Sequence, residues 1–336
     1  MHTRIDRVTV TTTLALALTG GLLLIAAGEA PPPWAYGFAA PAGAATAATL
    51  PAPPPVQDDG SPKRLEGSSG AFTLTQIRDA FGPADWYPGD HPTMPDVVAH
   101  GRRPDVRACG LCHMPNGKGR PENAGVTGLS VAYFTQTLAD FKNGVRKSAE
   151  PRKANTNTMI TIAKGMTDQE VKAAAEYFGS MKWTPWIKVI EADTVPKSRS
   201  AGGMFLKIEG GEKEPIGRRV IEMPVDTEHT ELLRDPHSGF MAYAPIGSLK
   251  QGEALVKAGG NGKTTACAVC HGADLKGLGP VPGLAGRSPS YAARQLYDMQ
   301  QHARAGVWTE LMMPVVSKLT TDDILAISAY LASLAP

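Results

Sequence analysis

The stretch C-G-L-C-H at residues 109–113 returns as C-A-V-C-H at residues 267–271, and this pair decides the fold. Both stretches have the form Cys-x-x-Cys-His, and together they contain all four cysteines of the chain. The same residue types follow each histidine at the same distances, 15, 20 and 25 positions. They are Gly128, Tyr133 and Leu138 after the first motif and Gly286, Tyr291 and Leu296 after the second. Equal spacing at several positions indicates two copies of one fold.

The pattern of apolar, capping and glycine residues predicts that each copy is mainly helical. A short helix with a glycine stop is expected before each motif. A helix with apolar residues at helical spacing is expected after the motif, and a threonine-capped helix closes the copy. These elements are Val97–Gly101, Tyr133–Phe141 and the helix after Thr167 in the first copy, and Ser248–Ala258, Tyr291–His302 and the helix after Thr320 in the second.

The Cys-x-x-Cys-His motif suits covalent haem attachment for a geometric reason. Cysteines at positions i and i+3 share one face of a helical turn, where both can form thioethers with the vinyl groups of one porphyrin. The histidine that follows places its imidazole on the iron. We therefore expect two covalently bound haem c groups. Their attachment residues are Cys109, Cys112 and His113 in the first copy and Cys267, Cys270 and His271 in the second.

Three other uses of paired cysteines fit less well. A thiol–disulfide exchange site would sit near a βαβ pattern, which this sequence lacks. A zinc site would need the two pairs to converge, yet each pair has its own histidine within its own copy. A structural disulfide across so short a loop would be strained.

A methionine is expected as the second axial ligand of each iron, as in low-spin electron carriers. Met159 and Met312 are the candidates, because each lies seven positions before the hydrophobic residue that enters the last helix of its copy. Each also precedes a tyrosine by 18 positions. Met313 is adjacent to Met312 and remains an alternative ligand for the second iron.

The N-terminus is predicted to direct export. Residues 1–30 form a signal peptide or an anchor: two arginines come first, and no charged residue occurs from Val8 to Gly28. We favour a cleaved signal over a membrane anchor, and either leaves the rest of the chain outside the cytoplasm. No single cleavage site stands out, and Gly37-Phe38-Ala39 and Ala45-Thr46-Ala47 are the two candidates. The net charge of +2 is too small to indicate nucleic acid as a partner.

Composition divides the remainder into four parts. Residues 31–70 are rich in proline and alanine and are expected to be a linker that packs no core. Residues 71–186 form the first haem domain, 187–243 an insert and 244–336 the second haem domain. The insert matches neither copy. Alternating and β-branched residues predict short strands at Trp186–Glu191, Phe205–Ile208 and Arg219–Met223, and we interpret the insert as a brace between the domains.

Both copies resemble class I cytochrome c domains, and their tandem order is similar to the dihaem cytochrome c4 family. The resemblance rests on the attachment motifs together with Pro282–Gly286, Tyr291, Gln295-Leu296, Met312 and Leu319–Ile324. It implies a periplasmic protein with His/Met-ligated haems. The first copy departs from the pattern, because Ala124–Gly128 replaces Pro282–Gly286 and lacks the proline. Packing and hydrogen bonding near His113 are therefore expected to differ from those near His271, so the two potentials need not be equal.

The expected function is electron transfer without substrate chemistry. The donor would be a dehydrogenase or a quinol-oxidising complex, and the acceptor a partner such as a terminal oxidase. The alternatives are a peroxidase-like or thiosulfate dehydrogenase-like dihaem enzyme, or a membrane-anchored cytochrome subunit of a dehydrogenase complex. A basic cluster is interpreted either as a docking site for an acidic partner or as a counter-charge for haem propionates. It consists of Arg146, Lys147, Arg152 and Lys153.

Overall fold

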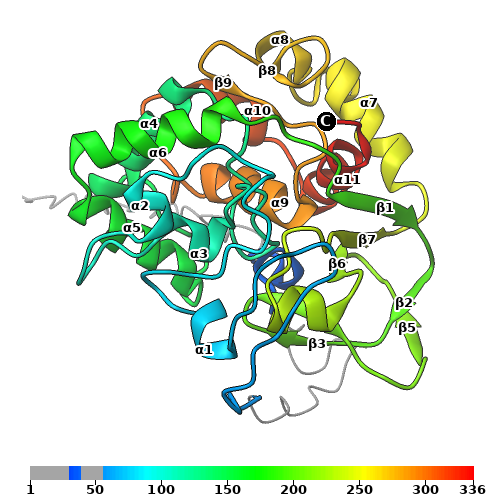
Figure 1. The fold of residues 1–336 in the computed structure, drawn as a ribbon. Coiled ribbons are helices and arrows are strands. Elements are labelled where there is room, and N and C mark those ends of the chain that lie inside the picture. The colour runs from blue at the N-terminus through cyan, green and yellow to red at the C-terminus, as the bar shows by residue number, and fades with distance from the viewer. Residues whose placement is uncertain (1–29, 39–55) are drawn as a thin grey trace, which may run out of the picture.

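The computed structural model describes residues 30–38 and 56–336. Helices of the first copy and helices of the second gather on opposite sides, and the strands of the insert lie beneath the second copy (Figure 1). After α1 (Leu74–Ile77), the first copy contains α2 (Asp96–Ala99), α3 (Cys109–His113), α4 (Val131–Lys142), α5 (Ala154–Gly165) and α6 (Asp168–Ser180). The second contains α7 (Ser248–Gly262), α8 (Ala268–His271), β8 (Gly277–Leu278), β9 (Val281–Pro282), α9 (Pro289–Gln300), η3 (Glu310–Met312), α10 (Met313–Val316) and α11 (Thr321–Ser333).

The predicted helix ends are confirmed where capping residues define them. Thr167 accepts a hydrogen bond from the Glu170 N–H and begins α6, and Thr320 does the same for α11 with Asp323. In both cases the acidic side chain returns a bond to the backbone of the threonine, which completes a capping box. The regular part of α7 ends before Gly259, whose φ of 66° lies in the left-handed region that glycine adopts readily.

The insert contains more strands than the sequence predicts. They are β1 (Ile187–Glu191), β2 (Thr194–Pro196), β3 (Ser198–Ala201), β4 (Met204–Lys207), β5 (Lys213–Pro215), β6 (Ile221–Pro224) and β7 (Phe240–Ala244), with the π-helical η2 (Glu228–Leu232) between the last two. The predicted strands correspond to β1, β4 and β6. The central strand β7 pairs in parallel with β1 and antiparallel with β6. The β1–β7 pairing joins segments about 50 residues apart, which local sequence patterns do not reveal.

The insert shares its core with the second copy. Ile221 and Ala242 of the sheet pack in one apolar cluster with Val256 of α7 and Ile324 of α11. The first copy has a separate core around Val98, Phe141 and Phe178. The sheet therefore extends the second domain. The insert also packs against the first domain, through apolar clusters that place Met114 with Phe240 and Trp86 with Leu233, and through polar contacts that are described below.

The proline- and alanine-rich segment departs from its expected role as a linker without a core. Pro33–Tyr36 forms a short 3-10 helix, η1, that lies beside α9 (Figure 1). Trp34 is 4% exposed, and Ala35 and Tyr36 are fully buried in the core of the second copy. Two aromatic side chains among the prolines provide the apolar area that the rest of the segment lacks.

The expected signal or anchor falls outside the described residues, apart from Ala30. Within residues 30–38 and 56–336, no helix combines the length and the apolar character that a membrane crossing requires. The choice between cleavage and anchoring stays a prediction.

Candidate haem sites

The two motif histidines make the same hydrogen bond. His113 Nδ1 hydrogen-bonds the carbonyl oxygen of Ala124 at 2.8 Å, and His271 Nδ1 hydrogen-bonds that of Pro282 at 2.8 Å. A carbonyl oxygen only accepts, so Nδ1 must carry the proton. Burial lowers the pKa of both imidazoles, which favours the neutral form. Each ring is therefore held with Nε2 as the free lone pair, the state that ligates a metal.

The prediction that hydrogen bonding differs between the copies is wrong for the contact made by the motif histidine. Ala124 stands where the second copy has Pro282, yet the bond length is the same and both acceptors lie 11 residues after the histidine. The acceptor is a backbone carbonyl, so the side chain of that residue is not needed. Any difference in potential between the two sites must come from other neighbours.

The four cysteines are free: Cys109 and Cys112 lie on α3, Cys270 lies on α8, and Cys267 is the residue just before α8. Burial raises the pKa of Cys109 to about 12 and that of Cys267 to about 11. Such thiols stay protonated at neutral pH and are poor redox nucleophiles on their own. Their spacing and lack of disulfide pairing fit thioether attachment, with Cys109 and Cys112 at one haem and Cys267 and Cys270 at the other.

A cavity of about 870 Å³, its opening included, lies in the first copy between α4 and α5. His113 and Met159 both line it, with the apolar side chains of Phe134, Leu138 and Phe141 around them. Met159 lies on α5, a helix that the sequence analysis did not predict. The structure thus brings the expected histidine and methionine of the first site to one cavity with an apolar lining, as a porphyrin requires.

One side of this cavity is basic. Lys153 is 4% exposed, lines the cavity, and its Nζ has no hydrogen-bond partner. Burial and the nearby Arg294 lower the pKa of Lys153 to about 7. A buried ammonium without a partner is costly, and a carboxylate would stabilise it. The propionates of a haem supply such carboxylates, so the residues present fit the group.

Burial also decides between the two interpretations of the basic cluster. Arg146 and Lys153 are buried and line the cavity, so neither presents its charge to an approaching protein. Arg152 is exposed but pairs with Glu150, with Nη2 and Oε2 2.7 Å apart. Arg146 and Lys153 therefore cannot take part in docking, whereas Lys147 is exposed. For the two buried residues, counter-charge for propionates is the hypothesis that the geometry favours.

The second copy forms part of the wall of the first cavity. Tyr291, Arg294, Gln295 and Asp298 on α9 all line it. Arg146 Nη2 donates to Tyr291 Oη at 3.0 Å and to Gln295 Oε1 at 2.8 Å. The sequence analysis named Tyr291 and Gln295 only within the second copy and did not predict their contact with the first, although equivalent positions in a repeat were a signal that could have revealed it.

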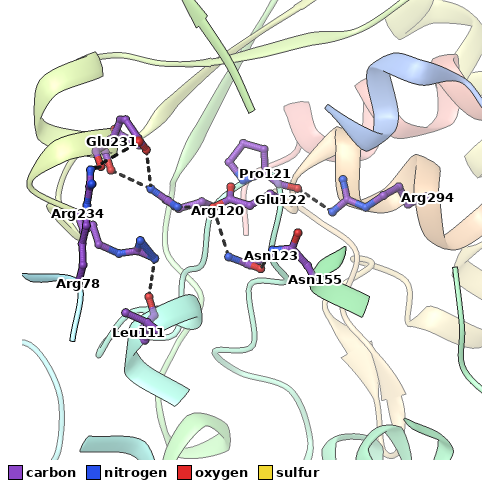
Figure 2. A network of polar contacts seen from close by, with 11 residues as sticks. Arg78, Leu111, Arg120, Pro121, Glu122, Asn123, Asn155, Glu231, Arg234 and Arg294 are labelled. Atoms are coloured by element: carbon purple, nitrogen blue, oxygen red, sulfur yellow. Dashed lines mark hydrogen bonds and ion pairs between the residues drawn. The ribbon is translucent and has the colours of Figure 1, made fainter. Parts of the chain in front are cut away.

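The insert covers the attachment loop of the first copy (Figure 2). Arg234 Nη2 donates to the carbonyl oxygen of Leu111, inside the Cys-x-x-Cys-His loop, at 2.7 Å. Arg120 lies beside it, with Nη2 2.5 Å from Glu122 Oε1 and Nη1 3.1 Å from the Thr230 carbonyl oxygen. Burial is the main reason why the pKa of Arg234 falls to about 10. These contacts support the interpretation of the insert as a brace between the domains.

The attachment loop of the second copy is much more exposed. Val269 is 68% exposed, whereas Leu111 at the equivalent position is partly buried. Leu278 is 62% exposed, whereas the equivalent Arg120 is buried beneath the insert. The insert therefore makes the two haem sites unequal in their access to solvent.

Two adjacent residues, Met312 and Met313, remain candidates for the methionine ligand of the second iron. Met312 ends η3 and Met313 begins α10, and both pack partly buried against the core of the second copy. The assignment of Met312 is still a prediction from the repeat.

Comparison with known proteins agrees with this arrangement. The cytochrome c family model matches residues 99–182 and 250–335. Cytochrome c4 of Stutzerimonas stutzeri is 34% identical over 139 residues, which cover 37% of this chain and 65% of that protein. Cytochrome c4 of Azotobacter vinelandii is 32% identical over 165 residues, covering 43% and 78%. A thiosulfate dehydrogenase electron acceptor of Stutzerimonas stutzeri (strain A1501) is 35% identical over 78 residues, covering 23% and 35%. The chain therefore belongs to the cytochrome c family, with two cytochrome c domains that bind covalently attached haem c and with cytochrome c4 among its relatives.

Proposed function

We propose that this chain is a periplasmic electron carrier. It accepts electrons from a dehydrogenase or a quinol-oxidising complex and delivers them to an acceptor such as a terminal oxidase. When bound, each haem supplies reversible one-electron exchange at its iron. The residues that would hold the iron are His113 and Met159 at the first site and His271 and Met312 at the second.

The shared histidine geometry carries this proposal. Each Nδ1 is fixed on a carbonyl oxygen at 2.8 Å, which leaves each Nε2 as the free lone pair for a metal. In the first copy Met159 lines the same cavity as His113, so it would be the second protein ligand of a haem bound there. An iron with both axial positions filled by protein exchanges electrons but has no open position for a substrate.

The sequence offers less support for an enzyme. A dihaem peroxidase needs one iron with an open or displaceable ligand, whereas each copy here places a methionine at the matched position. An enzyme with a cysteine as the distal ligand would need a further cysteine, and all four belong to the attachment motifs.

A thiosulfate-oxidising enzyme is the second candidate for the donor. The relative named as an electron acceptor of thiosulfate dehydrogenase is 35% identical over its matched part. That name describes a carrier, so this candidate concerns the identity of the partner and leaves the carrier role unchanged.

The carrier proposal is tested by the reactivity of the reduced protein toward small ligands. We expect neither haem to bind carbon monoxide, and we expect no sustained consumption of hydrogen peroxide, because both irons are closed. Ferricyanide should oxidise both haems fully. Stoichiometric carbon monoxide binding at one haem, or catalytic turnover of peroxide, would favour the enzyme alternative.

A further inference from the structure

The N-terminal segment Pro33–Phe38, which we call the N-terminal turn, is built into the folded protein. Gly37 closes it in the left-handed conformation, with a φ of 72°. A Cβ atom added at Gly37 would lie 2.1 Å from the carbonyl oxygen of Gly203, so the turn lies flush against the insert. The Ser200 hydroxyl donates to the Gly37 carbonyl oxygen, and the Arg152 guanidinium lies 4.3 Å from the Phe38 ring centroid.

Two hydrogen bonds connect the N-terminal turn to helix α9. Tyr36 Oη donates to Asp298 Oδ1 at 2.8 Å, and Arg294 Nη1 donates to the Ala35 carbonyl oxygen at 2.5 Å. Both α9 residues are about 5% exposed or less. The N-terminal turn therefore provides partners for two buried charged groups, which would otherwise remain desolvated and incompletely bonded.

The same two residues form part of the first haem cavity. Arg294 and Asp298 both line it. The other nitrogen of Arg294, Nη2, donates to the Pro121 carbonyl oxygen of the first copy at 2.7 Å, and the blue ribbon of the N-terminal turn passes beside this arginine (Figure 2). Asp298 Oδ1 also accepts from the Ala149 N–H at 2.8 Å. The N-terminal turn thus supports the cavity wall from behind, at the point where the two domains meet.

We propose that Pro33–Phe38 is retained in the mature protein as a positioning segment for the first haem site. Export processing then cuts before Pro33 or does not cut at all. Cleavage after Ala39 or Ala47, the two candidate sites from sequence, would remove the N-terminal turn and leave Arg294 and Asp298 without these partners. This proposal therefore excludes both of those cleavage sites.

The first test locates the mature N-terminus. The full chain is expressed with its own leader in a bacterium that attaches haem c, and the purified holoprotein is analysed by intact mass and N-terminal sequencing. We expect the chain to begin at or before Pro33, or at its original N-terminus. A mature chain that begins after Phe38 would overturn the proposal.

The second test separates positioning from simple packing. Tyr36→Phe removes only the hydroxyl that bonds Asp298, and Tyr87→Phe is the matched control, because Tyr87 Oη donates to the Glu66 carbonyl oxygen away from the cavity. Each variant is purified with two haems and titrated for reduction potential. The redox wave of the first haem is identified as the one whose midpoint potential Met159→Ala shifts.

We expect Tyr36→Phe to displace the wave of the first haem and to leave that of the second unchanged. Tyr87→Phe should displace neither. Two unchanged waves in Tyr36→Phe, or equal displacement of both, would show that the N-terminal turn does not position the first site.

Discussion

Arg146 and Arg304 form a reciprocal pair across the seam between the two haem domains. Each lies 33 residues after the histidine of its own motif, and their backbones meet in an isolated antiparallel bridge. Arg146 donates to Tyr291 Oη at 3.0 Å, and Arg304 donates to Tyr133 Oη at 2.9 Å. Because the tyrosines are also equivalent, the seam has local two-fold symmetry that follows from the repeat.

This reciprocal pair should hold the domains together. Arg146→Leu removes charge-assisted bonds to Tyr291 and Gln295 in a buried setting, so we expect a loss of about 1–3 kcal/mol in the free energy of unfolding. Arg304→Leu should cost a similar amount. Lys142→Leu changes an exposed charge and should stay within about 0.5 kcal/mol. Denaturant unfolding measures all three, and an Arg146→Leu protein as stable as the control would contradict this role.

The insert should protect the first attachment loop. Arg234 has a φ of 53° and bonds the Leu111 carbonyl oxygen. Arg234→Asn keeps a residue that tolerates the left-handed backbone and removes the long side chain, so the effect reports the lost contact. We expect faster amide hydrogen exchange in residues 105–120 and a loss of about 1–3 kcal/mol in stability.

The control for this variant is Arg218→Asn, whose exposed guanidinium pairs with Asp322 far from the loop. Its exchange in residues 105–120 should match that of the wild type. Unchanged exchange in both variants would mean that the insert does not stabilise the loop.

His91 should make stability depend on pH. Its Nε2 lies 3.2 Å from Asp85 Oδ1, and this hydrogen bond raises the pKa of His91 in the folded state. The stabilising contribution is fully present below the unfolded pKa of about 6.5 and is lost as pH rises through the higher folded value. We expect about 0.5–1 kcal/mol less stability from this group at pH 8 than at pH 6.

His91→Gln should remove that part of the pH dependence, as measured by denaturant unfolding at several pH values. A variant with the same pH profile as the wild type would exclude His91 as its source.

Substitution should decide which methionine ligates the second iron. Met312→Leu is expected to remove half of the methionine-to-iron absorption, because the repeat aligns Met312 with Met159. Met313→Leu should leave that absorption intact and serves as the matched control. The opposite pattern would assign Met313.

Much of the helical framework follows from local sequence signals. Thr167 and Thr320 mark helix starts through side chains that bond their own next turn, and such signals need no knowledge of the fold. Helix α5 was missed because Asn155-Thr156-Asn157-Thr158 has low helix propensity, which tertiary packing overrides. The repeat also singled out His113 and Met159, which both line one cavity, and their role as iron ligands stays a prediction.

The rest depends on contacts between distant segments. Trp34 and Tyr36 lie in a proline-rich run, and their burial against α9 joins positions about 260 residues apart. Neither this contact nor the covering of Leu111 by Arg234 has a local pattern in the sequence. Long-range polar contacts of this kind made the haem sites unequal, although the repeat alone presents them as equivalent.

The most direct test of the central claim is the absorption spectrum of the purified protein, oxidised and reduced, with the weak far-red methionine-to-iron band of the oxidised form. The account predicts two haems per chain and a band of full strength for both. Met159→Leu should halve it, and Met166→Leu, which changes a buried core methionine of the same copy, should not. A band that corresponds to one haem, or a high-spin signal in the wild type, would contradict His/Met ligation at both sites.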